Sequence, residues 1–92
     1  MRLKGKKCIV TGGSSGIGEA TVRRFISEGA KVLIADINFE DSKKISEEIG
    51  EGVDYIKCDV RLEDDIISVS EKAYGMWDQV DVLVNNAGSE LN

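Results

Sequence analysis

Apolar and polar residues follow two different patterns that alternate along the chain. Four short runs rich in apolar residues are typical of strands in a sheet that is covered on both faces. They lie at residues 6–12, 31–36, 53–60 and 80–88. Three further segments have apolar residues at helical spacing, and these lie at residues 16–28, 38–50 and 62–76. The pattern therefore predicts strands and helices in strict alternation.

Glycine and asparagine stand at the ends of the predicted helices. Gly29 and Gly50 are placed to end the first and second helices, and Asn38 can cap the start of the second. Strands and helices that alternate through short connections are typical of a parallel sheet with right-handed crossovers. We expect an α/β fold, a partial Rossmann-type doubly wound sheet of four strands in the order 3-2-1-4 with three helices. Its ligand crevice is expected between the first and fourth strands.

A glycine-rich turn, TGGSSGIG, directly follows the first predicted strand. The helix after it begins with unpaired N–H groups and the positive end of its dipole, which together attract an anion such as a pyrophosphate. Gly12 is expected to make the turn, Gly16 to admit the phosphates and Gly18 to let the helix pack tightly against the sheet. The turn therefore predicts a diphosphate ligand, although a tight turn without a ligand is an alternative.

Two other phosphate-binding motifs fit the turn poorly. The phosphate loop of nucleoside triphosphatases needs Lys and Ser or Thr where Glu19 and Ala20 stand. The G-x-G-x-x-G fingerprint is broken at Ser14 and Thr21. The pattern that fits is T-G-x-x-x-G-x-G.

With this pattern the chain resembles the short-chain dehydrogenase/reductase family. The resemblance extends along the whole chain, since AD closes the second predicted strand, CDV the third and NNAG the fourth. It implies that residues 1–92 are the N-terminal portion of a single dinucleotide-binding domain. The complete enzyme is then expected to transfer hydride between NAD and an alcohol or carbonyl substrate.

The resemblance also implies a role for each matching residue. Around the pyrophosphate and the adjoining ribose it places Gly12, Ser14, Ser15, Gly16, Ile17 and Gly18. Asp36 is expected to bind the hydroxyls of the adenosine ribose, and Asp59 and Val60 are expected to border the adenine. Asn85 is expected to tie the central strands together. The residues expected to line the crevice near the cofactor are Asn86, Ala87 and Gly88.

Asp36 also bears on the choice of cofactor. Its charge is expected to repel the 2′-phosphate of NADP, and Ile37, Asn38, Ser14 and Ser15 provide no cation to compensate. The sequence therefore predicts NAD.

The catalytic Ser and Tyr-x-x-x-Lys of the family have no counterpart in this sequence. Tyr55 and Tyr74 are followed four residues later by Asp59 and Asp78, and Ser89 is too early to match the catalytic serine. We therefore expect no catalytic residue here and no hydride transfer by this chain alone. Alternatives are a non-catalytic nucleotide-binding or sensing module, and an interaction protein that keeps the fold without the ligand.

Composition indicates where the protein is located and which classes of partner it does not bind. A net charge of −5 without a Lys/Arg cluster argues against nucleic acid and anionic membranes. The apolar runs are too short to span a bilayer and the N-terminus lacks the apolar segment of a secretory signal, so a cytoplasmic location is expected.

Cys8 and Cys58 have no metal-site spacing and no His to complete one, so no metal site is expected. We expect both to be buried thiols beyond disulfide reach.

The fourth predicted strand is expected at an edge of the sheet. An apolar edge with free N–H and C=O groups is a template for association. We therefore expect self-association or a complementary C-terminal segment as partner. The third predicted helix has an apolar stripe that comprises Leu62, Ile66, Val69, Ala73 and Trp77. In relatives this helix pairs with the next one to build a subunit interface, so the resemblance implies the same role here. Packing of the helix on its own sheet is the alternative, and it explains most of the stripe.

Overall fold

The computed structural model describes residues 2–86, in which strands and helices alternate. The strands are β1 (Lys7–Thr11), β2 (Lys31–Asp36), β3 (Val53–Lys57) and β4 (Val82–Asn85). The helices are α1 (Gly16–Ser27), α2 (Phe39–Ile49) and α3 (Glu63–Met76). The predicted order of elements is confirmed.

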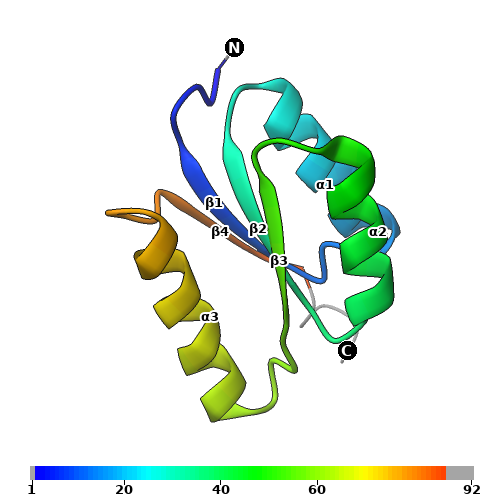
Figure 1. Ribbon diagram of the computed structural model, residues 1–92, viewed down its shortest axis with the longest axis vertical. Helices are drawn as coiled ribbons and strands as arrows, with labels where there is room; N and C mark the ends of the chain where they lie inside the picture. The colour runs from blue at the N-terminus through cyan, green and yellow to red at the C-terminus, as the bar shows by residue number, and fades with distance from the viewer. Residues whose placement is uncertain (1, 87–92) are drawn as a thin grey trace.

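The four strands form one parallel sheet in the order β3-β2-β1-β4, as predicted. In the register of the sheet, Thr11 lies beside Ala35 on one side and Asn85 on the other, and Asp36 lies beside Lys57. All the strands point the same way, so their carboxyl ends meet at one edge of the sheet (Figure 1). The loops that follow β1, β2 and β3 therefore lie close together.

Helices cover both faces of the sheet, with α1 and α2 on one face and α3 on the other (Figure 1). Side chains of a strand alternate between the faces, so each face has its own core cluster. The buried residues under α1 and α2 are Cys8, Val10, Val22, Ala30, Val32, Ile34 and Ile45. Those under α3 are Ile9, Leu33, Ala35, Cys58, Val69 and Ala73.

The predicted helix ends agree with the backbone. Gly29 and Gly50 have φ values of 93° and 87°, which residues with a side chain rarely adopt. At the start of α2, the Asp41 N–H donates to Asn38 Oδ1 at 3.0 Å, so Asn38 caps the helix as expected. The capping bond fixes the first turn of α2 beside the end of β2.

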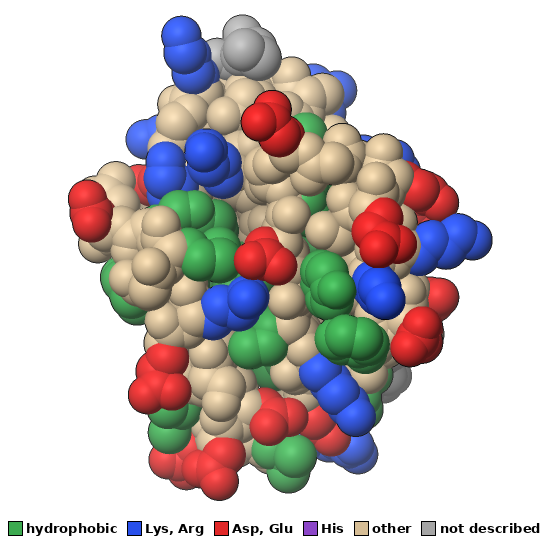
Figure 2. Space-filling view, in the orientation of Figure 1, with side chains coloured by type: hydrophobic (Ala, Val, Ile, Leu, Met, Phe, Trp, Pro, Cys, Tyr) green, Lys and Arg blue, Asp and Glu red, His purple; other side chains and the backbone are tan. Residues whose placement is uncertain are grey.

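The apolar stripe of α3 is buried in only part of its length. Val69 and Ala73 are buried, whereas Leu62 and Ile66 are 52% and 47% exposed. Acidic residues occupy the first turn of α3, and Figure 2 shows acidic side chains gathered over this part of the molecule. Negative charge at a helix N-terminus is stabilising. Within residues 2–86, no helix is long and apolar enough to cross a membrane.

Candidate functional site

A cleft of about 350 Å³ opens at the carboxyl ends of β1, β2 and β3. It is lined by Gly12, Ser14, Ser15, Asp36, Ile37, Asn38, Asp41, Cys58, Asp59, Val60 and Arg61. The crevice that the sequence places between the first and fourth strands stays a prediction, and a smaller hollow lined in part by Thr11, Leu83 and Asn85 lies there. The larger cleft over β1, β2 and β3 brings together predicted residues of three separate loops.

The glycines of the turn after β1 meet different demands. Gly12 has a φ of 68°, and its N–H donates to the carbonyl oxygen of Ala35 at 2.9 Å. A Cβ on Gly18 would overlap the Gly12 carbonyl group, so the approach of α1 to the turn excludes any side chain there. A Cβ on Gly16 would meet no atom within 4 Å. Backbone conformation therefore explains Gly12 and packing explains Gly18, whereas a side chain at residue 16 would meet no atom of the described residues.

The amino end of α1 is not capped by a side chain. Ser15 stands at its N-cap, but the Ser15 hydroxyl donates to the carbonyl oxygen of Gly12 at 2.9 Å. The first N–H groups and the positive end of the helix dipole are thus available to an anion. Ile17 belongs to this first turn, but its side chain is 77% exposed. Gly16, Ile17 and Gly18 do not line the cleft.

Asp36 is a buried carboxylate at the end of β2, only 7% exposed. Its Oδ2 accepts hydrogen bonds from the Ser14 N–H at 2.9 Å and the Ser14 hydroxyl at 2.5 Å. Its Oδ1 accepts one from the Asn38 N–H at 2.9 Å. Since an ionised carboxylate offers about four acceptor positions, Asp36 is held in place and still has acceptor capacity. It joins the glycine turn to the start of α2.

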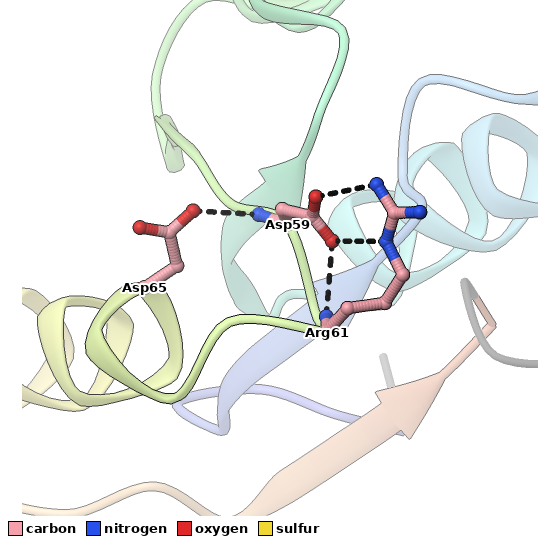
Figure 3. A network of polar contacts seen from close by, with 3 residues as sticks. All are labelled: Asp59, Arg61 and Asp65. Atoms are coloured by element: carbon pink, nitrogen blue, oxygen red, sulfur yellow. Dashed lines mark hydrogen bonds and ion pairs between the residues drawn. The ribbon is translucent and has the colours of Figure 1, made fainter.

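Asp59, Arg61 and Asp65 form a polar network after β3 (Figure 3), and Asp59 and Arg61 of this network line the cleft. Asp59 Oδ1 accepts from the Arg61 N–H at 3.0 Å and from Arg61 Nε at 2.9 Å, and Asp59 Oδ2 accepts from Arg61 Nη2 at 2.7 Å. The Asp59 N–H donates to Asp65 Oδ2 at 2.9 Å. The hydrogen bonds from Arg61 lower the pKa of the Asp59 carboxyl group to about 2. Sequence reasoning missed Arg61, whose only signal is its place two residues after Asp59.

Two asparagines connect β4 to the glycine turn. The Thr11 hydroxyl lies 3.1 Å from Asn85 Oδ1, which ties β1 to β4 as expected. Asn86 donates from its N–H to Thr11 Oγ1 at 3.0 Å and from Nδ2 to the Gly12 carbonyl oxygen at 3.3 Å. Asn86 thus supports the turn from behind and does not line the cleft. The predicted site residues Ala87 and Gly88 lie outside the described residues.

Both cysteines are buried free thiols, as predicted. Cys58 lines the cleft, and burial, with the nearby charges of Asp65, Asp59 and Asp36, raises the pKa of its thiol. Burial also raises the pKa of the Cys8 thiol. Across residues 2–86 no group of three or more His, Cys, Asp or Glu residues is arranged to hold a metal ion.

Comparison with known proteins identifies the family. The family model for short chain dehydrogenases matches residues 6–92. The chain belongs to the short-chain dehydrogenase family. A curated member from Melia azedarach, (21S)-21-acetoxyl-apo-melianone synthase SDR, is 41% identical over 87 residues, which are 95% of this chain and 32% of that protein. Zerumbone synthase of Zingiber zerumbet is 42% identical over 90 residues, covering 96% of this chain and 34% of that protein.

The fold of the short-chain dehydrogenases is matched as well. A crystal structure of 3-ketoacyl-(acyl-carrier-protein) reductase from Brucella melitensis, complexed with NADH, superposes with a TM-score of 0.85 and 34% identity. The match covers 88% of this chain and 33% of that one. The chain thus spans about a third of the length of the relatives that it matches.

Proposed function

We propose that this chain is the NAD-binding, N-terminal portion of a short-chain dehydrogenase domain. The observation that carries the proposal is the cleft in which the glycine turn after β1 and the buried carboxylate of Asp36 face a shared space. The NADH complex of the Brucella reductase supports it, because that protein has the same fold at 34% identity. The complete enzyme is proposed to oxidise an alcohol or reduce a carbonyl compound.

The chemistry of the cleft fits a dinucleotide. The uncapped start of α1 and the open space at Gly16 suit a pyrophosphate, which needs N–H donors and close approach to the backbone. Asp36 suits the ribose hydroxyls, since a fixed carboxylate accepts hydrogen bonds from a diol. Asp59 and Val60 suit the adenine end because they line the same cleft on the loop after β3. When bound, NAD supplies the carbon that accepts or donates the hydride.

Asp36 supports NAD over NADP. A 2′-phosphate carries a charge of about −1.5 to −2 at pH 7, which a neighbouring carboxylate repels. Arg23 cannot compensate from α1, because it is paired with Glu19 at 2.8 Å and Glu48 at 2.7 Å. NAD, which has a free 2′-hydroxyl, avoids this repulsion.

We infer a cytoplasmic location, which the two free thiols support, because a reducing compartment preserves them. We also infer that β4 pairs with a second copy or with a complementary C-terminal segment, since its Leu83 is 64% exposed.

Calorimetric titration with NAD and NADP tests the function. The chain is expected to bind NAD more tightly, and Asp36→Asn is expected to weaken NAD binding at least about tenfold, because charge-assisted hydrogen bonds to the ribose are lost. Asp78→Asn is the matched control, since Asp78 is exposed beyond the end of α3 and outside the cleft. Tighter binding of NADP by the unmodified chain, or no binding of either cofactor, would contradict the proposal.

A further inference from the structure

Arg61 is the one Lys or Arg residue that lines the cleft, within residues 2–86. The same lining contains three carboxylates, those of Asp36, Asp41 and Asp59. The Arg61 side chain is 68% exposed, so apart from its contacts with Asp59 it has room to move. The cleft can therefore offer an anion a cationic partner only when the Arg61 guanidinium is not bound to Asp59.

Arg61 lies on the loop next to the end of β2. Strands β2 and β3 are neighbours, with Asp36 beside Lys57, and the Cys58 N–H donates to the Asp36 carbonyl oxygen at 2.9 Å. The loops that continue from these strand ends carry Asn38 and Arg61 into the lining of one cleft. A long arginine side chain released on this loop can therefore turn toward the ribose end of the cleft.

In the structure, Asp59 binds the Arg61 side chain and keeps it from binding an anion at the ribose end of the cleft. Arg61 Nε and Nη2 both donate to the Asp59 carboxylate, at 2.9 and 2.7 Å, in the forked geometry that arginine uses for carboxylates and phosphates (Figure 3). The Asp65 carboxylate accepts from the Asp59 N–H and so fixes the backbone at Asp59. A phosphate would have to compete with Asp59 for the same guanidinium edge.

We propose that the Asp59–Arg61 pair is a determinant of cofactor selectivity, because Asp59 withholds from a 2′-phosphate the cation that could bind it. The inference rests on the proposed function, in which the ribose lies at Asp36. Asp36 then repels the 2′-phosphate, and Asp59 prevents Arg61 from offsetting this repulsion. Selectivity for NAD thus depends on the lining after β3 as well as on Asp36.

Binding of the adenosine half of the cofactor tests the inference. The probes are ADP-ribose and 2′-phospho-ADP-ribose, titrated calorimetrically against the whole 92-residue chain. Asp59→Asn is expected to raise the affinity for 2′-phospho-ADP-ribose, relative to ADP-ribose, by about tenfold, since the freed guanidinium gains a charge-assisted bond. In Asp59→Asn/Arg61→Gln this gain is expected to disappear.

Asp41→Asn is the matched control for charge. It removes one negative charge from the same lining but leaves the Asp59–Arg61 pair intact. Its gain in relative affinity is expected to be about threefold or less, because it changes only the surrounding field. Thermal unfolding of each variant checks that the fold is retained. Should Asp59→Asn prevent folding, Asp59→Ser serves instead, because the serine hydroxyl can still accept from the Arg61 N–H but carries no charge to hold the guanidinium.

The outcomes separate the two claims. If the unmodified chain binds ADP-ribose but Asp59→Asn gains no more than Asp41→Asn, the inference is wrong while the proposed function stands. A gain that persists in the double variant also overturns it, since Arg61 is then not the source. If the unmodified chain binds neither probe, the proposed function fails and the inference fails with it.

Discussion

Asp36 and Arg61 show how differently single residues can be recognised from sequence. Asp36 could be predicted because it closes a buried strand about 20 residues after the glycine turn, a position defined along the chain. Arg61 could not, because its importance depends on a tight turn that folds its side chain back onto Asp59. The prediction that no cation offsets a 2′-phosphate was argued from Ile37, Asn38, Ser14 and Ser15. It did not consider the loop after the neighbouring strand, where Arg61 also lines the cleft.

The Asp59 carboxyl group is expected to titrate at about pH 2, below its ordinary value of 3.8, because Arg61 donates hydrogen bonds to its charged form. Since the folded pKa is the lower one, the pair stabilises the fold above the ordinary value and loses this effect as the pH falls toward 2. The side-chain carboxyl chemical shift of Asp59, followed by NMR against pH, measures the midpoint.

Arg61→Gln is expected to move that midpoint upward toward the ordinary value. Arg23→Gln is the control, because Arg23 pairs with Glu19 and Glu48 and not with Asp59. A midpoint near 4 in the unmodified chain would show that the fork does not persist in solution.

Among the elements, the helices were predicted to within one residue at each end, whereas some strand ends were predicted less well. The predicted third strand runs to residue 60, whereas β3 ends at Lys57. Cys58 and Val60 continue an apolar pattern, but they are apolar because they line the cleft and pack under α3, not because they extend the sheet. A hydrophobic pattern reports burial and cannot distinguish these two causes.

Gly18→Ala is expected to destabilise the junction of β1 and α1. The new Cβ would overlap the backbone of Gly12, and relief requires α1 to move, so the free energy of unfolding should fall by about 1–3 kcal/mol. Gly75→Ala is the matched control in α3, where a Cβ meets no atom within 4 Å. That variant should be about 0.5–1 kcal/mol more stable, because alanine favours the helix.

Urea denaturation at pH 7 measures both variants. Equal effects of the two substitutions would argue that the turn after β1 tolerates a side chain at residue 18.

At the scale of the whole molecule, the strand order could be predicted because alternating strands and helices allow few arrangements. The order leaves β4 with a described neighbour on one side only, β1.

The chain is therefore expected to self-associate through β4 when no complementary segment is present. Leu83→Lys should shift it toward monomer, because a charge on an exposed edge strand opposes pairing. Tyr74→Lys is the control, since Tyr74 is 60% exposed on α3 and not on the edge. Light scattering after gel filtration measures the mass. A stable monomer of the unmodified chain at all concentrations would refute the expectation.

The central position of β1 also affects how the chain folds during its synthesis on the ribosome. Its partner β2 follows it closely in the chain, but the contact between Lys7 and Asp81, just before β4, joins residues 74 positions apart. At translation rates of about 5–20 residues per second, one edge of β1 waits several seconds for its partner. During that interval a nascent chain on the ribosome presents an unpaired apolar strand. We therefore expect chaperones to protect this protein from aggregation mainly before β4 is synthesised, by covering the unpaired edge of β1.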